Sequence, residues 1–397
     1  MAEDQLDPVA EKRLRAQRQQ QRQQLIQPHT VARNANVGLC VSMAYDNVLA
    51  QRMRGGMALP FLQASANAQS NAWWLDKYLQ LIASAQRARG AGVMPREFDR
   101  CIELAAHYLL QTAWFEGAPL GQLAHVGNKL SRHPNQQACV DAIAWIAGQV
   151  NQADDLVGLG GYPSVLLLNA FSKNIDSGRC ERAVARLARY LGCDDTARQS
   201  LQAQGVSLAL NTFSKWFDHP DCQATAHRLA ARVAGDRHLR CAMDAQNVAN
   251  TLNALSKWHD NVLCAAAVSA LAERLADDSQ LRKALKMQEL VNALNALSKW
   301  PDRQVCAQVA SMLAERLAND YRLRKAMDPI NLTQALNALS KWPNARSCGH
   351  TISVLASCLL DDPELRKVLD PQGVSIALNA LSKWPDTPVC ADAVKAL

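Results

Sequence analysis

A block of 42 residues recurs along this chain and limits what the chain can fold into. Its clearest mark is Ser-Lys-Trp, often followed by Pro, which returns every 42 residues from Ser214 to Ser382. Degraded copies begin at Ser172, one period earlier, and at Ser131, a further 41 residues back. Seven units in register predict a repeat protein, in which each unit buries its apolar face against its neighbours.

Other residue types keep the same period and form ladders of equivalent positions. The asparagine ladder precedes each motif serine by three residues and comprises Asn128, Asn169, Asn211, Asn253, Asn295, Asn337 and Asn379. The lysine ladder comprises Lys215, Lys257, Lys299, Lys341 and Lys383, and the tryptophan ladder comprises Trp216, Trp258, Trp300, Trp342 and Trp384. The cysteine ladder follows the serine by eight residues and comprises Cys139, Cys180, Cys222, Cys264, Cys306, Cys348 and Cys390. The arginine ladder comprises Arg198, Arg240, Arg282, Arg324 and Arg366.

The hydrophobic pattern within one unit is helical. Apolar residues recur at 3.6-residue spacing from Leu290 to Trp300, which predicts an amphipathic helix over this segment. We expect Asn295, Ser298 and Lys299 on its opposite, polar face.

Prolines and N-capping residues predict where the helices of a unit begin and end. Pro301 should end the first helix, because proline cannot donate a backbone hydrogen bond. A second helix should contain Cys306 to Leu317, and a short third segment should run from Tyr321 to Met327. Asp328 and Asp370, each followed by proline, suit the N-cap of the next helix.

Two longer helices and one short helix in 42 residues are close to HEAT or armadillo geometry. We therefore expect an all-α fold, a right-handed α-solenoid over residues 93–397 whose last repeat is truncated. Residues 1–35 should form a disordered Gln/Arg-rich tail, and residues 36–92 a helical N-terminal cap. We expect Trp73 and Trp74 to be buried in that cap. A last repeat that stops within its second helix suggests a fragment of a longer array.

Composition excludes several other classes of protein. No apolar run is long enough for a membrane span, and the N-terminus lacks the apolar core of a secretory signal. The 12 cysteines include no CxxC, and seven of them lie in register with the repeat, which indicates a reduced compartment. The net charge of +7 is mildly basic.

No pattern typical of an active site is present. The nine histidines are scattered, with no HExxH, no zinc spacing, no GxSxG and no P-loop. The glycine-rich segment 158–161 fails the dinucleotide-binding spacing and should be a loop between repeats. The sequence therefore predicts a protein that is not an enzyme, with no cofactor, no metal and no small-molecule substrate.

The ladders allow two interpretations. Cysteine is a small apolar residue suited to a tight helix interface, so we expect a structural role for this ladder. The helical phase of tryptophan also predicts core positions, with the indole N–H bonded near the helix end. Asparagine and lysine share the polar face, where amides could hold a peptide backbone or read nucleotide bases. Alternatively, asparagine joins adjacent repeats and lysine is solvated.

The segment Leu-Asn-Ala-Leu-Ser-Lys-Trp-Pro at 294–301 resembles the SKWP-repeat family of type III effectors from plant-pathogenic bacteria. The resemblance covers about residues 125–397, with departures at His133, Asn174, Phe217 and His259. It implies a HEAT/armadillo-like array that passes from the bacterial cytoplasm into a host cell through a type III system, with the Gln-rich N-terminus as export signal. The family supplies no active site.

A second similarity covers about one helix per unit. Residues 244–257 are similar to the helical units of octotricopeptide-type repeats, which implies binding of single-stranded RNA. Residues 160–397 contain 28 basic and 23 acidic side chains, and RNA-binding surfaces usually carry a denser basic stripe. The leading hypothesis is thus a virulence effector that binds host proteins along the solenoid groove. The alternatives are a modular RNA-binding protein and an inert segment of a longer effector.

Overall fold

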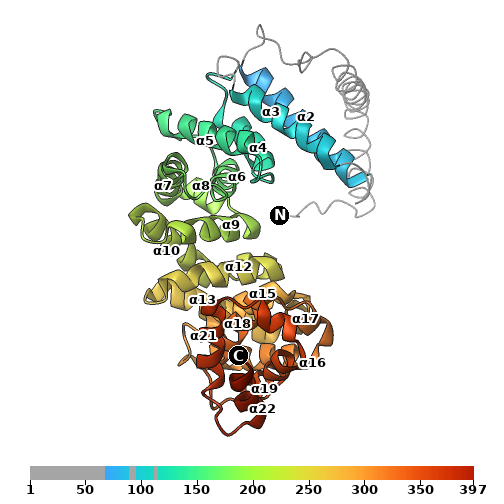
Figure 1. Cartoon of the computed structure of the whole chain (residues 1–397). Coiled ribbons are helices and arrows are strands. Elements are labelled where there is room, and N and C mark those ends of the chain that lie inside the picture. The colour runs from blue at the N-terminus through green and yellow to red at the C-terminus, as the bar shows by residue number, and fades with distance from the viewer. Residues whose placement is uncertain (1–67, 89–94, 111–114) are drawn as a thin grey trace, which may run out of the picture. The chain divides into compact units, whose positions relative to one another are not determined.

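The computed structural model describes residues 68–88, 95–110 and 115–397 (Figure 1). All regular structure in these ranges is helical, so the predicted all-α fold is confirmed. Contacts divide the chain into one unit that ends at Ala118 and a second unit from Pro119 to Leu397. The predicted tail 1–35 lies outside the described residues, as does the part of the predicted cap before residue 68. None of the described helices combines the length and the apolar character that a bilayer span requires.

The first unit contains two helices that pack against each other. They are α2 (Ala68–Ala88) and α3 (Pro95–Leu110). Leu75 and Leu79 of α2 and Leu109 of α3 are buried. Each helix therefore contributes an apolar face to their shared interface.

The prediction that Trp73 is buried is wrong, because 37% of this residue is exposed. Leu75 and Leu79 define the packed face of α2, and Trp73 lies on the other side of the helix. The ammonium of Lys77, one turn further on, lies 5.5 Å from the centroid of the Trp73 ring. The side chain of Trp74 is not among those that the structure describes.

The second unit repeats one pattern of helices. The first helix of each repeat has 11 residues: α4 (Leu120–Leu130), α6 (Gly161–Phe171), α9 (Ala203–Phe213), α12 (Ala245–Leu255), α15 (Met287–Leu297), α18 (Pro329–Leu339) and α21 (Pro371–Leu381). The long helix follows: α5 (Gln137–Gln152), α7 (Gly178–Cys193), α10 (Pro220–Gly235), α13 (Val262–Asp277), α16 (Gln304–Asn319), α19 (Arg346–Asp361) and the shorter α22 (Pro388–Ala396). A short helix closes most repeats: α8 (Asp195–Gln199), α11 (Arg237–Ala242), α14 (Ser279–Ala284), α17 (Tyr321–Lys325) and α20 (Pro363–Lys367).

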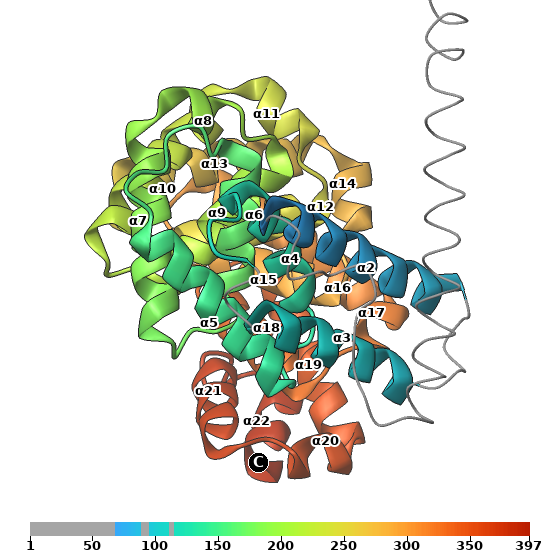
Figure 2. The same cartoon turned by 90° about the horizontal axis from the view of Figure 1, so that it is seen from above.

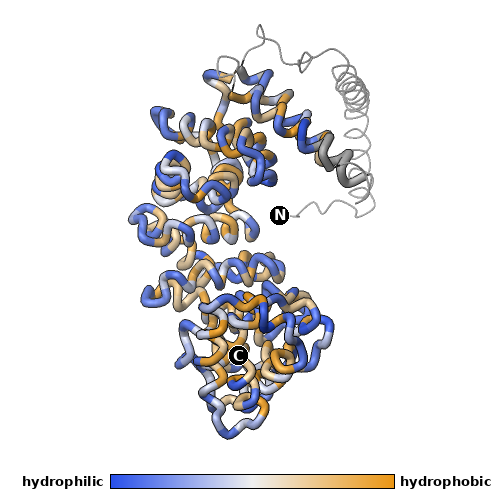
Figure 3. Tube along the Cα trace, in the orientation of Figure 1, coloured by the Kyte–Doolittle hydropathy of each residue, from blue (hydrophilic) through white to orange (hydrophobic). Residues whose placement is uncertain are grey.

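These helices form two layers of a solenoid. Each first helix packs against the first helices of its neighbours and against its own long helix, and the long helices likewise pack against one another. Figure 2 shows α6, α9, α12 and α15 nearer the centre of the curved array than the long helices α7, α10 and α13 or the short helices α8, α11 and α14. The first helices thus form the inner layer. Apolar and polar residues alternate along each helix (Figure 3), as an amphipathic repeat requires.

The predicted N-caps are confirmed at both positions. The Asp328 carboxylate accepts a hydrogen bond from the backbone N–H of Asn331 at 2.6 Å, and Asp370 accepts one from Gly373 at 2.6 Å. Asp194, Asp236, Asp278, Asp320 and Asp362 cap the short helices in the same way, at the 42-residue period. Every short helix therefore begins at a carboxylate that satisfies its first backbone donors.

The first helix ends three residues earlier than predicted. α15 stops at Leu297, and the Ser298 side chain donates to the backbone carbonyl of Asn295 at 2.7 Å. Lys299 and Trp300 then continue as tight turns. Ser298 is buried, so its predicted place on the polar face is wrong. The helix ends before Pro301 because the serine hydroxyl competes for its last carbonyls.

The glycine-rich segment forms a loop, as predicted. Gly158 and Gly160 adopt φ values of 80° and 79°, which side chains with a Cβ rarely adopt. The loop takes the place of a short helix between α5 and α6. Gly161 then begins α6, and a Cβ at this position would lie 2.4 Å from the carbonyl oxygen of Ala197.

Candidate binding surface

One face of each first helix is left open by packing. In α15, Leu290 and Leu294 are fully buried, whereas Gln288 is exposed and Asn292 is half-buried; Lys299, in the turn after the helix, is also exposed. Since the long helix covers one side and neighbouring first helices cover two more, the open face is the one turned away from the outer layer. The seven open faces lie side by side along the inner layer.

We call the equivalent positions on this face of the seven repeats the inner stripe; all are at least partly exposed except Leu166, which is buried. In repeat order its residues are Gly121, His125, Asn128, Arg132; Tyr162, Leu166, Asn169, Lys173; Gln204, Leu208, Asn211, Lys215; Gln246, Asn250, Asn253, Lys257; Gln288, Asn292, Asn295, Lys299; Ile330, Gln334, Asn337, Lys341; Gln372, Ile376, Asn379, Lys383. None is a carboxylate. Amides occupy half of the stripe, and its last position is a lysine or arginine in every repeat.

Acidic residues border the stripe at the turn into the long helix. Asp176, Asp218, Asp260, Asp302 and Asp386 lie three residues after the lysine column, and all are exposed. No ion pair joins an aspartate of these turns to a lysine of the stripe in the structure. The inner layer therefore presents a row of positive groups next to a row of negative ones.

The asparagine ladder contains two kinds of position. Asn169 donates to the side-chain oxygen of Asn128 at 2.8 Å, which joins the first two repeats. Five members make no side-chain hydrogen bond within the described residues: Asn211, Asn253, Asn295, Asn337 and Asn379. All except the exposed Asn379 are half-buried. These amides keep their donors and acceptors available to a ligand.

The lysine ladder is also divided. The Lys215 ammonium donates to the backbone carbonyl of Ser172 at 2.6 Å, and Lys383 reaches the carbonyl of Ser340 at 3.0 Å. Burial lowers the pKa of Lys215, and the nearby Lys173 lowers it further. Lys257, Lys299 and Lys341 are exposed and make no hydrogen bond within the described residues.

The tryptophan ladder joins consecutive repeats. The indole N–H of Trp300 donates to the backbone carbonyl of His259 at 3.0 Å, and that of Trp258 donates to Phe217 at 3.0 Å. Trp342 makes the equivalent bond to Pro301 at 3.1 Å. In each case the acceptor directly follows the tryptophan position of the preceding repeat.

The two end members differ from these three. Trp216 and Trp384 are half-buried and make no such hydrogen bond. The Asn174 amide, which stands where tryptophan is lost, donates to the carbonyl of Val140 in the preceding repeat at 3.3 Å.

The cysteine ladder lies inside the long helices. All seven members are buried, and each has a free thiol. Burial raises the pKa of the Cys222 and Cys264 thiols to about 12 and that of Cys306 and Cys348 to about 11. Within the described ranges no group of three or more His, Cys, Asp or Glu side chains could hold a metal ion. The ladder packs as a small apolar residue.

The arginine ladder caps the long helices. Arg240 donates to the last carbonyls of α10 at Val233 and Ala234, at 2.8 and 2.6 Å. Arg198, Arg282, Arg324 and Arg366 make the same pair of bonds one repeat apart. These guanidinium groups satisfy carbonyls that the end of a helix leaves without partners.

A second set of arginines was missed by the sequence analysis. Arg232, Arg274 and Arg316 lie 42 residues apart on the long helices, and each donates to a backbone carbonyl of the preceding short helix. Burial lowers the pKa of all three. The shared period would have revealed them as a ladder, although it could not have shown their acceptors.

No model of a known protein family matches this chain, and the search of curated proteins finds no match either.

Proposed function

We propose that this chain is a non-enzymatic scaffold that binds an extended segment of another protein along the inner stripe. The observation that carries the proposal is the set of five ladder amides, Asn211 to Asn379, that lie on the open face and have no side-chain hydrogen-bond partner among the described residues. A side-chain amide donates through its NH2 and accepts through its oxygen, which are the two functions that a peptide backbone needs.

The spacing of the repeat suits an extended polypeptide. Neighbouring helices pack about 8–10 Å apart, and an extended chain advances about 3.3 Å per residue. One asparagine would therefore meet about every third residue of the bound segment. Open positions beside the asparagines vary from Leu208 to Asn250 and Gln334, so the side chains of the segment meet different surroundings in each repeat.

The charges favour a polypeptide over a nucleic acid. A polyanion would benefit from Lys257, Lys299 and Lys341 but would be repelled by the exposed Asp260 and Asp302 next to them. A polypeptide that carries both signs of charge can complement both rows. We therefore place RNA binding among the outcomes of the test.

The resemblance to SKWP-repeat effectors supports a host cell as the place where this binding occurs. In that setting the chain acts after translocation into a host cell, and its target is a host protein.

The test compares two triple variants of the full chain. N253A/N295A/N337A removes three ladder amides from the inner stripe. Q223A/Q280A/Q308A removes three exposed amides from the outer layer and serves as the matched control. Circular dichroism verifies that both variants fold. Peptides are selected from a random display library on the wild-type chain, and their affinities are then measured for all three proteins.

We expect the selected peptides to bind the inner variant about tenfold more weakly, a loss of about 1.4 kcal/mol, and the outer variant unchanged. Equal affinities for the three proteins would contradict the proposal. Failure to enrich any peptide, together with binding of a randomised single-stranded RNA that survives physiological salt, would favour the RNA-binding alternative. Failure with both ligands would favour the inert segment.

A further inference from the structure

A pocket of about 800 Å3 lies on the outer layer of the solenoid, away from the inner stripe. It is an open depression formed where α8, α10 and α11 meet, wide enough to admit a small molecule. Its charged lining consists of Arg198, Arg228, Arg232, Arg237, His238 and one carboxylate, Asp236. The lining is positive on balance, although Arg198 forms an ion pair with Asp195 beside the pocket and Arg232 a long one with Asp236.

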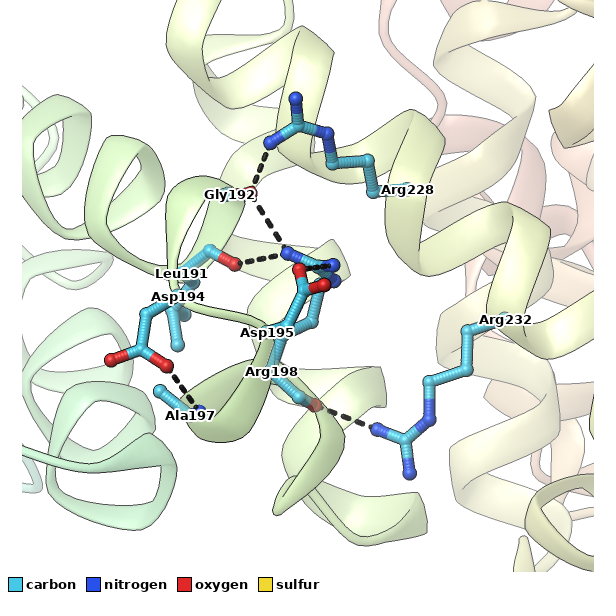
Figure 4. A network of polar contacts seen from close by, with 8 residues as sticks. All are labelled: Leu191, Gly192, Asp194, Asp195, Ala197, Arg198, Arg228 and Arg232. Atoms are coloured by element: carbon cyan, nitrogen blue, oxygen red, sulfur yellow. Dashed lines mark hydrogen bonds and ion pairs between the residues drawn. The ribbon is translucent and has the colours of Figure 1, made fainter.

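Backbone carbonyls hold three of these arginines in place (Figure 4). Arg228 of α10 and Arg198 of α8 both donate to the carbonyl of Gly192, and Arg198 also donates to Leu191 at 3.0 Å. Arg232 donates to the backbone carbonyl of Arg198 at 2.8 Å. Because a guanidinium has five N–H donors, each arginine keeps donors beyond those that the backbone uses.

Arg232 has one weak acidic partner in the pocket, a long ion pair with Asp236. Its Nε is buried and makes no hydrogen bond within the described residues. The nearest carboxylate oxygen, on Asp236, is 4.0 Å away. Burial lowers the pKa of Arg232, and the neighbouring Arg198 lowers it further against the opposing effect of Asp236. An anion in the pocket would meet donors that are already oriented.

The extra basic residues are not required by the repeat. Arg198 and Arg232 belong to the two structural ladders, and the next repeat has Arg240 and Arg274 in their places. Arg228, Arg237 and His238 correspond there to Ala270, Ser279 and Gln280. The next junction therefore folds the same way without these three groups, although Arg228 here also donates to the backbone carbonyl of Gly192.

We propose that this pocket binds a small anion that carries two or more phosphate groups. Arginine suits this ligand because its planar fork of N–H donors matches phosphate oxygens in pairs. The exposed Arg228, Arg237 and His238 form the mouth, and the half-buried Arg198 and Arg232 form the floor. The proposal does not depend on the function proposed for the inner stripe.

The test measures the binding of pyrophosphate to the full chain by isothermal titration calorimetry. The variant R228A/R237S/H238Q gives the pocket the residues that the next repeat carries at the same positions, which keeps the fold intact. The control K257Q/K299Q removes two positive charges from the inner stripe. We expect saturable binding to wild type, binding about tenfold weaker to the pocket variant, and unchanged binding to the control.

A second arm distinguishes the source of the phosphate. Inositol hexakisphosphate represents a soluble ligand, and phosphatidylcholine vesicles with added phosphatidylinositol phosphate represent a lipid headgroup. Binding of either that the pocket variant loses and the control keeps supports the proposal and identifies the source. The proposal is overturned if wild type binds none of the three probes at low ionic strength, or if the control loses as much affinity as the pocket variant.

Discussion

Arg316 donates hydrogen bonds to the backbone carbonyl of Arg282, whose own guanidinium caps the long helix α13. One arginine thus holds the short helix that positions the other. Arg316 also donates to the backbone carbonyls of Lys283 and Leu285, at 3.0 and 2.8 Å, so it contacts the short helix and the residue that follows it. The two arginine ladders form a connected network that passes through the backbone from one repeat to the next.

This relationship predicts energetic coupling between the two residues. We expect Arg282→Met and Arg316→Met each to lower the free energy of unfolding by about 1–3 kcal/mol, since each leaves helix-end carbonyls without a charged donor. The double variant should lose less than the sum of the two, by about 0.5 kcal/mol or more. Urea unfolding of the four proteins measures the coupling, and strict additivity would show that the two arginines act independently.

The indole bonds predict a graded effect of tryptophan replacement. Trp300→Phe keeps most of the buried ring but removes the N–H that reaches His259, and it should lower the free energy of unfolding by about 1–3 kcal/mol. Trp216→Phe is the matched control, because Trp216 makes no such bond and should lose less. Comparable losses at both positions in urea unfolding would mean that ring packing alone explains the ladder.

Two glycines predict opposite responses to the same change. At Gly161 a Cβ would lie 2.4 Å from the Ala197 carbonyl oxygen and 2.8 Å from Leu201, so Gly161→Ala should be destabilising by several kcal/mol. At Gly148, within α5, no atom lies within 4 Å of a Cβ, and Gly148→Ala should add about 0.5–1 kcal/mol. Thermal denaturation followed by circular dichroism gives the sign of each change. A stable Gly161→Ala variant would contradict the close contact between α6 and α8.

The buried cysteines predict a loss of stability at alkaline pH. Burial raises the pKa of Cys264 to about 12, above its ordinary value of 9.0. A raised pKa means that the unfolded chain releases the proton first, so this contribution is complete below about pH 9 and falls as the pH approaches 12. The slope is at most about 1.4 kcal/mol per pH unit for each thiol.

The variants Cys264→Ala and Cys241→Ala isolate this effect. The first lacks the buried thiol, so its free energy of unfolding should fall less steeply than that of wild type between pH 9 and pH 11. The second lacks an exposed thiol of α11 and should follow wild type more closely. Parallel curves for wild type and Cys264→Ala would show that the thiol is accessible to hydroxide in the folded chain.

Exposure also predicts which cysteines react. A brief pulse of iodoacetamide at neutral pH, followed by peptide mass spectrometry, should label Cys193 and Cys241 and leave the cysteine ladder unlabelled. Labelling of the ladder should appear only when urea unfolds the repeats. Rapid labelling of Cys264 in the native chain would contradict the packing of the long helices.

Local structure was predictable because it depends on residues close together in sequence. The caps at Asp328 and Asp370 follow from an acceptor next to proline, and the buried face of α15 follows from the 3.6-residue period. The end of α15 was misplaced because proline was the only stop signal considered, whereas the Ser298 hydroxyl bonds to the carbonyl of Asn295 before Pro301 is reached.

Contacts between repeats could not be predicted in the same way. The sequence shows that Lys215, Lys257 and Lys299 are equivalent, yet only Lys215 reaches the preceding repeat. That difference depends on how closely two neighbouring repeats approach, which the spacing does not specify. The pocket of α8, α10 and α11 was missed for a related reason, because residues such as Arg198 and Arg237 meet only after stacking.

The three indole bonds of the tryptophan ladder run to a carbonyl of the preceding repeat, and a backbone carbonyl is present whichever residue occupies that position. Trp258, Trp300 and Trp342 find their acceptors at a phenylalanine, a histidine and a proline. A gene segment that encodes one period could therefore be duplicated or deleted by recombination, and a carbonyl would still be present at the acceptor position of each remaining repeat. As far as these indole bonds are concerned, the length of such a protein can change in steps of one repeat without a compensating mutation.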